Sequence, residues 1–254
     1  MQTQIQIGHV YFILPIYNEE VGLPPLLEIL STLPLPNGRT IVAVNDGSKD
    51  GSEAILTEGL TRFPLKVITH SPNRGIPGVF KSAFEYVVPI LQANDVVILM
   101  ESDRTSDPAL IPLFLERLAA GSDIVIGSRH APGGAYVQFP WYRTMASSIV
   151  NICLGLTWRL PGVQDYTIFY RAYSARILKS AFANGVSFKA TKSFAANGEI
   201  LLILAPHHPK TEEIPLKYNY GMKSGASSMP LVATLLEYIR LAGMYSGNRG
   251  AARD

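Results

Sequence analysis

Residues 95–108, with the sequence DVVILMESDRTSDP, run from an apolar segment directly into a group of carboxylates. The apolar part is typical of a strand that is covered on both faces of a sheet. Asp107 and Pro108 fit the N-cap and the first position of a following helix. Glu101 and Asp103 have no such structural duty, and two carboxylates on one turn can hold Mg²⁺ or Mn²⁺ against a diphosphate. The stretch therefore predicts a buried strand with a ligand site at its end.

The same alternation of apolar runs and helix-like segments extends on both sides of this stretch. The runs are rich in Val and Ile and lie at residues 9–17, 40–46, 65–70, 95–101 and 123–128. The helix-like segments between them lie at residues 22–33, 52–63, 78–91 and 108–120. Strands and helices in alternation are typical of βαβ units, so we expect an α/β fold with a mostly parallel central sheet flanked by helices.

The pattern loosens after residue 128. We expect a loop at 129–140, helices at 141–160, 197–205 and 229–245, and strands at 163–173 and 212–220. No repeat or linker interrupts the chain. The sequence thus predicts one domain over residues 1–245 with an elaborated C-terminal half, followed by a flexible tail at 246–254.

The composition excludes several classes of protein. Of the 254 residues, 47% are hydrophobic and 17% are charged, which is typical of a globular chain with a full core. The formal net charge of +2 gives no general attraction to nucleic acid. The single cysteine, Cys153, excludes an intrachain disulfide framework. The sequence shows neither a signal peptide nor a membrane span of roughly 20 apolar residues. We expect a cytoplasmic protein, with peripheral membrane contact left open.

Polar residues follow the predicted strands at the positions where ligands bind in open parallel sheets. Asp46, in the stretch NDGSKDGS, could accept hydrogen bonds from a nucleobase or ribose, or could simply belong to a turn. Arg74, with Gly75 and Gly78, lies near a helix start that could face phosphate, although the spacing matches no phosphate-binding loop. Asp46 and Arg74 are therefore candidate nucleotide ligands.

Further candidates lie in the second half of the chain. Arg129, Arg143 and Arg171 could return to the same edge of the sheet, although each one taken alone is more typical of a surface arginine. Asp165 is either a turn residue or a site residue. Glu199 is either a carboxylate in the first turn of a helix or a site residue.

Seven motifs in order resemble those of the inverting family 2 glycosyltransferases with the GT-A fold, over residues 8–230. The motifs are LPIYNEEVGLPPLL, VAVNDGSKDGS, NRGIPGVFKSAF, MESDRTSDPALIP, DIVIGSRHAPGG, DYTIFYRAY and EEIPLKY. Within the family, the chain is most similar to dolichol- and polyprenyl-phosphate mannosyltransferases. The resemblance implies a Rossmann-like GT-A fold.

The resemblance also implies roles for individual residues. The residues implied to line the nucleotide pocket are Pro15, Tyr17, Glu19 and Asp46, and we add Arg74 and Ser102 as candidate nucleotide ligands. Glu101 and Asp103 stand in the positions that hold a divalent metal and the diphosphate. Arg129 is expected to face a phosphate, while Asp165 and Arg171 are expected near the transferred sugar and the acceptor. Glu199 partly matches a family motif that contains a glutamate.

The sequence departs from the family pattern at several positions. Glu101 and Asn45 each replace an aspartate, and Ile168 and Phe169 stand where small residues are usual. Ser228 takes the place of a family lysine. These departures concern the acceptor more than the donor.

The resemblance implies that the chain moves a hexose, with inversion, from a nucleoside-diphosphate sugar such as GDP-mannose or a UDP-sugar, with Mg²⁺ or Mn²⁺. The implied acceptor is a polyprenyl phosphate, which needs no general base. A soluble hydroxyl acceptor would need one, and Asp165 or Glu199 would supply it. A sugar nucleotidyltransferase and a non-catalytic protein that binds nucleotide sugars are the alternatives.

Overall fold

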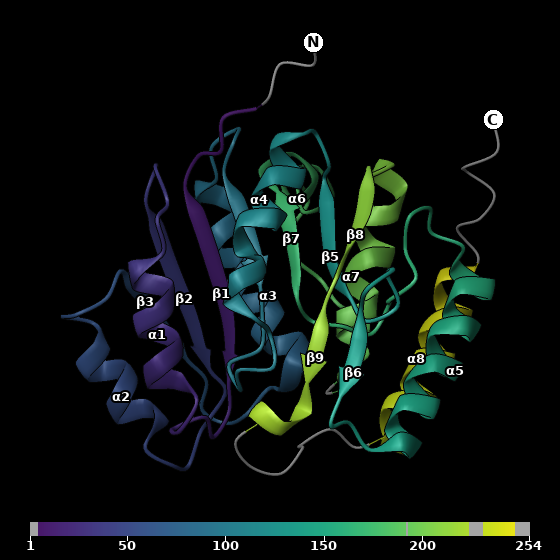
Figure 1. Cartoon of the computed structure of the whole chain (residues 1–254), viewed down its shortest axis with the longest axis horizontal. Helices are drawn as coiled ribbons and strands as arrows, with labels where there is room; N and C mark the ends of the chain where they lie inside the picture. The colour runs from purple at the N-terminus through teal and green to yellow at the C-terminus, as the bar shows by residue number, and fades with distance from the viewer. Residues whose placement is uncertain (1–4, 192, 224–230, 247–254) are drawn as a thin grey trace.

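The computed structural model describes residues 5–191, 193–223 and 231–246. Its centre is a seven-stranded sheet in the order β3-β2-β1-β4-β7-β5-β8 (Figure 1). The strands are β1 (Val10–Ile16), β2 (Arg39–Asn45), β3 (Leu65–Thr69), β4 (Val96–Leu99), β5 (Ile124–Ser128), β7 (Arg171–Ser174) and β8 (Thr211–Pro215). All neighbours pair in parallel except β7, which is antiparallel to both β4 and β5. The predicted α/β fold with a mostly parallel sheet is confirmed.

Helices follow most strands, as the alternation predicts. They are α1 (Leu23–Thr32), α2 (Ser52–Gly59), α3 (Gly75–Val87), α4 (Ile111–Ala119), α5 (Trp141–Trp158), α6 (Ala175–Ala181), α7 (Ala196–Leu204) and α8 (Leu231–Ser246). Short 3₁₀ turns lie at η1 (Val88–Ile90), η2 (Pro108–Leu110), η3 (Ala205–His207) and η4 (Tyr220–Met222). The Asp107 side chain accepts a hydrogen bond from the Ala109 amide at 2.9 Å, so the predicted N-cap is confirmed.

The apolar runs form the core because the central strands are covered on both faces. Phe12, Ile13 and Leu14 of β1 are fully buried, as is every residue of β4. Leu23, Leu26, Leu27 and Leu30 recur at helical spacing and bury one face of α1. Continuous apolar strands and a single apolar helix face are the pattern of a sheet between helix layers.

Three expectations for the second half are wrong in part. Of residues 163–173, only the last three form strand, because side chains bind the backbone of the preceding segment: the Tyr166 amide donates to Asn151 Oδ1 at 2.8 Å. The expected strand 212–220 divides into β8 and β9 (Lys217–Asn219), which belong to different sheets. The expected loop 129–140 contains β6 (Ala135–Val137), which pairs in parallel with β9. Helix α6, capped by Ser174, was not expected.

Helices α5 and α8 pack against each other at one edge of the molecule (Figure 1). Both helices expose large apolar side chains to solvent. On α5, Trp141 is 73% exposed, Ile152 62% and Leu156 65%, and on α8, Leu236 and Ile239 are each 62% exposed. Within the described residues, no helix is both long enough and apolar enough to cross a bilayer. Ser228 and residues 247–254 lie outside the described ranges, and the extent of the domain stays a prediction.

Candidate active site

A cavity of about 460 Å³ lies at the carboxyl ends of the parallel strands. One end of it is polar and carries the side chains of Glu19, Asp46, Glu101, Ser102, Asp103, Arg129 and Lys223. The other end is mainly apolar and is lined by Phe139, Ile149, Val150, Ile168, Phe169, Phe194, Leu235 and Tyr238, together with Arg143, Ser147 and Thr234. The apolar end thus reaches α5 and α8, while the polar end lies over β1, β2, β4 and β5. Such a cavity suits a ligand that carries a charged group and an apolar group.

Carboxylates crowd the polar end. Burial, followed by repulsion from Asp103, raises the pKa of Glu101 to about 7. The same two causes raise the pKa of Glu19 to about 7. Glu19 Oε2 is buried and has no hydrogen-bond partner among the described residues. The crowding of carboxylates at this end favours the binding of a cation.

The residues present fit a divalent cation that is shared with a ligand. The turn after β4 holds its carboxylates in place: Ser106 hydrogen-bonds Glu101, and Asp103 Oδ1 accepts from the Thr105 amide at 3.1 Å. The described residues hold no group of three His, Cys, Asp or Glu side chains arranged to bind a metal. Mg²⁺ is commonly held by one or two carboxylates together with substrate phosphates, which suits Glu101 and Asp103.

Lys223 already places a positive charge on this turn. Its ammonium forms an ion pair with Asp103 Oδ2, and the lysine side chain is 16% exposed. Lys223 follows the short turn η4, beyond β9. No sequence pattern links this lysine to Asp103, from which it lies 120 residues away along the chain.

Arg129 is fixed in the cavity wall by Asp165. The guanidinium donates from Nε to Asp165 Oδ2 at 2.8 Å and from Nη2 to Asp165 Oδ1 at 2.6 Å. Burial alone would raise the pKa of Asp165, but Arg129 outweighs burial and lowers this pKa to about 2. Nη2 also donates to Thr167 Oγ1 at 2.6 Å, while Nη1 has no hydrogen bond to any described residue. Arg129 lines the cavity and can offer Nη1 to an anion.

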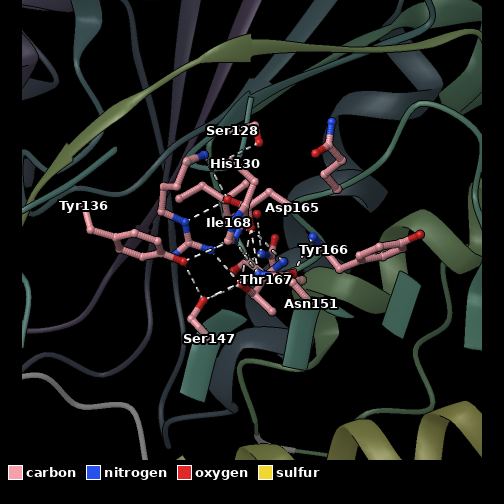
Figure 2. A network of polar contacts seen from close by, with 12 residues as sticks. Ser128, His130, Tyr136, Ser147, Asn151, Asp165, Tyr166, Thr167 and Ile168 are labelled. Atoms are coloured by element: carbon pink, nitrogen blue, oxygen red, sulfur yellow. Dashed lines mark hydrogen bonds and ion pairs between the residues drawn. The ribbon is translucent and has the colours of Figure 1, made fainter. Parts of the chain in front are cut away.

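A wider polar network surrounds this pair (Figure 2). Thr167 and Asn151 both contact Asp165, and Asn151 Nδ2 donates to Thr167 Oγ1 at 3.2 Å. Ser147 lies beside Thr167, with the two hydroxyl oxygens 3.4 Å apart. The Arg129 guanidinium lies 4.9 Å from the ring centroid of Tyr136 on β6 and 5.6 Å from that of Tyr218 on β9. The small second sheet thus packs aromatic rings against the arginine, which limits its movement.

Asp46 follows β2 and faces the first turn of α3. Its Oδ1 accepts from His70 Nδ1 at 2.7 Å and from the Arg74 amide at 2.8 Å. Its Oδ2 accepts from the Gly75 amide at 2.9 Å. An anion at a helix N-terminus is favoured by the free amides and the helix dipole. Asp46 therefore anchors α3 and also lines the cavity.

The structure brings most of the predicted site residues together and places others elsewhere. The cavity is lined by Pro15, Tyr17, Glu19, Asp46, Glu101, Ser102, Asp103 and Arg129. Ile168 and Phe169 line it as well, as part of the apolar end. Asp165 lies behind Arg129 and does not line the cavity. Arg74 is exposed outside it, and only its backbone amide contacts Asp46.

Two further predicted residues are buried away from the cavity. Arg171 is fully buried in β7 and donates to the carbonyl oxygens of Asn197 at 2.5 Å and Tyr166 at 2.8 Å. Glu199 accepts hydrogen bonds from the amides of Lys189 and Ala190 at 2.6 and 2.8 Å. Both side chains therefore hold backbone segments in place. Arg143, the remaining arginine named from the sequence, does line the cavity. The lining residues that the sequence did not single out include Phe139, Tyr218, Tyr220 and Lys223.

Comparisons with known proteins agree with this geometry. The family model "Glycosyl transferase family 2" matches residues 11–182. A dolichol-phosphate mannosyltransferase from Pyrococcus furiosus is 26% identical over 235 residues, which are 91% of this chain and 62% of the relative. An undecaprenyl-phosphate mannosyltransferase from Micrococcus luteus is 31% identical over 185 residues, which are 71% of this chain and 72% of the relative. The chain thus spans less than two thirds of the length of the first of these relatives.

Solved structures confirm the fold. Glucosyl-3-phosphoglycerate synthase from Mycobacterium tuberculosis, crystallised with Mn²⁺, uridine diphosphate and glucosyl-3-phosphoglycerate, has a TM-score of 0.69 to this chain. The two chains are 15% identical, and the match covers 95% of this chain and 80% of the other. At this identity the likeness concerns the fold, which is that of the GT-A glycosyltransferases.

Proposed function

The chain belongs to glycosyl transferase family 2, and on this basis we propose that it transfers a hexose, with inversion, from a nucleoside-diphosphate sugar to a polyprenyl phosphate. The observation that carries the proposal is the cavity with two unlike ends. A charged end at the strand termini suits a diphosphate and its cation, and an apolar end between α5 and α8 suits a lipid chain. The names of the curated relatives, which act on dolichol or undecaprenyl phosphate, support this acceptor class.

The polar end supplies the groups that the transfer needs. Glu101 and Asp103 would hold Mg²⁺ or Mn²⁺, which neutralises negative charge on the leaving diphosphate. Structural neighbours crystallised with Mn²⁺ or Mg²⁺ support a divalent ion. Arg129, locked by Asp165, would use its free Nη1 to orient a phosphate. Asp46, Pro15, Tyr17 and Ser102 would bind the nucleoside, with Glu19 beside the diphosphate.

A phosphate acceptor agrees with the proton chemistry of the site. It arrives ionised, so its oxygen can attack without a general base. With a pKa of about 2 and both oxygens bound to Arg129, Asp165 is a poor proton acceptor at neutral pH. Glu199 lies outside the cavity. Neither Asp165 nor Glu199 is therefore placed to act as the general base that a hydroxyl acceptor would need.

A transfer assay tests this proposal. Labelled sugar from UDP- and GDP-linked donors should enter an organic-extractable product when polyprenyl phosphate and Mn²⁺ are present. Adding a chelator should abolish the transfer. Label that appears only on soluble hydroxyl compounds would move the acceptor to that class, and tight nucleotide binding without turnover would indicate a non-catalytic binding protein.

The exposed apolar side chains of α5 and α8 should contact the membrane that carries the acceptor. We call them the apolar stripe, and they include Trp141, Ile149, Ile152, Leu156, Leu235, Leu236 and Ile239. Ile149 and Leu235 are 56% and 44% exposed and also line the cavity, so the stripe is continuous with the apolar end. Amphipathic helices with such faces lie in the interfacial region of bilayers. Trp141 extends the stripe along α5, at the end nearest to Arg143.

We expect the protein to co-float with anionic liposomes. Ile152→Asp with Leu156→Asp should abolish co-flotation, since two buried charges would oppose insertion at the interface. Trp141→Ala should weaken it. Ile29→Asp is the matched control, because Ile29 is an exposed residue of α1, 42% accessible and remote from the stripe. Equal flotation of the double variant and the control would refute the membrane contact.

A further inference from the structure

The geometry points to a donor whose base offers a single N–H to Asp46, as uracil does, and against guanine. This inference rests on the proposed function, in which a nucleoside diphosphate binds with its base at Asp46. The sequence leaves UDP- and GDP-linked donors equally open. The arrangement around one carboxylate separates them.

Asp46 has almost no acceptor capacity left for a ligand. A carboxylate offers about four acceptor positions on its two oxygens. His70 Nδ1 and the Arg74 amide occupy Oδ1, and the Gly75 amide occupies one position of Oδ2. One position on Oδ2 remains, and Asp46 lines the cavity. A ligand can therefore donate one hydrogen bond to this carboxylate.

His70 is the residue that takes the position on Oδ1. It follows β3, is 2% exposed, and its second ring nitrogen, Nε2, lies 2.8 Å from Ser82 Oγ on α3. Because the carboxylate only accepts, Nδ1 carries the proton, which leaves Nε2 of a neutral ring to accept from the serine hydroxyl. Contacts at both ring nitrogens fix the imidazole, so His70 acts as a positioning residue for Asp46.

The carboxylate cannot turn to free a second position. Asn73 Nδ2 donates to the Asp46 carbonyl oxygen at 2.7 Å and holds the backbone of Asp46 in place. Rotation of the carboxylate would also leave the His70 ring and the two amides without an acceptor in a buried place. The free position on Oδ2 is thus a fixed feature of the cavity wall.

The two bases differ in the number of donors that they present. Uracil has one N–H, at N3, which matches the single free position. The Watson–Crick edge of guanine presents N1–H and the N2 amino group side by side, and pairing both with one carboxylate needs a free position on each oxygen. At Asp46 the second donor would meet an oxygen that His70 and the Arg74 amide already fill. One donor of guanine would stay unpaired, which disfavours its binding.

Binding of UDP and GDP, measured by calorimetry with Mn²⁺, tests the inference. UDP should bind the wild-type protein at least about tenfold more tightly than GDP. In His70→Leu, which frees a position on Oδ1, the ratio of the two dissociation constants should fall toward one. In His70→Asn, whose amide keeps a donor near the place of Nδ1, the preference should persist. A loss of protein stability alone would weaken the binding of UDP and of GDP alike and would leave the ratio of their dissociation constants unchanged.

His9→Leu is the matched control. His9 lies directly before β1, at the end of the strand away from the cavity, and its Nε2 lies 2.9 Å from Thr40 Oγ1. Its replacement therefore removes a histidine without changing the contacts of Asp46. Its nucleotide preference should equal that of the wild type. Equal or tighter binding of GDP to the wild-type protein would overturn the inference and leave the glycosyltransferase proposal standing. Binding of neither nucleotide would overturn both.

Discussion

Asp103→Asn should lower the rate of sugar transfer at least about 100-fold, the scale on which electrostatic stabilisation of a transition state is lost. Asp103 is buried to 5% exposure, lines the polar end of the cavity, and lies close enough to Glu101 and Glu19 to raise the pKa of each. The substitution keeps the size of the side chain and removes its charge. A cation bound between this carboxylate and the leaving diphosphate would then lose its principal anionic partner on the protein.

Two measurements separate this role from a structural one. The rate at saturating donor should fall with little change in the free energy of unfolding, and Mn²⁺ should no longer strengthen nucleotide binding. Asp107→Asn is the control on the same turn, because Asp107 caps η2 and does not line the cavity. An Asp103→Asn protein with wild-type turnover, or one whose nucleotide affinity still responds to Mn²⁺, would contradict the assignment.

Asp165→Leu should destabilise the fold by about 3–5 kcal/mol, because it leaves the Arg129 guanidinium buried without its counter-ion. The Asp165 side chain is fully buried and that of Arg129 is 7% exposed. Urea denaturation should show the loss as a lower midpoint with an unchanged slope. Adding Arg129→Met to Asp165→Leu should recover much of the stability, since no charge remains buried, while transfer activity stays absent.

The pH dependence of stability should report the same pair. The folded-state pKa of Asp165, about 2, lies below its ordinary value of 3.8. Its contribution to stability is therefore fully present above about pH 4 and is lost as the pH falls toward about 2. The Asp165→Leu protein should lack this part of the acid transition. A double variant no more stable than the single one would show that the pair is not the cause.

The strands that follow one another in the first half could be predicted because each is a continuous apolar run that needs cover on both faces. Their polar ends could be predicted to meet because parallel strands share one edge, and Asp46, Glu101 and Asp103 do meet there. The antiparallel β7 could not be predicted in its place. Its four residues carry no turn signal and pair with strands that are distant in sequence.

The sequence also says little about which way a polar side chain faces. Arg129, Asp165 and Arg171 are all charged and all near strand ends, yet only Arg129 lines the cavity. Asp165 forms an ion pair with Arg129, and Arg171 donates hydrogen bonds to backbone carbonyl oxygens, because a buried charge needs a partner. Lys223 shows the converse case. Its contact with Asp103 depends on β9 pairing with β6, a three-residue ladder too short to leave a periodic pattern.

Because β7 lies between β4 and β5 in the sheet, the sheet cannot form strand by strand in the order in which the chain is synthesised. The first four strands are neighbours in the sheet, so they can assemble as soon as residues up to 99 have emerged. β5 emerges next, but both of its neighbours in the sheet, β7 and β8, are made later, at residues 171–174 and 211–215. We therefore expect the half of the sheet that carries Asp46 to form in the growing chain before Asp165 is available to pair with Arg129. Non-local pairing of this kind slows folding, and the apolar β5 stays exposed to other chains until β8, which ends at Pro215, has been made.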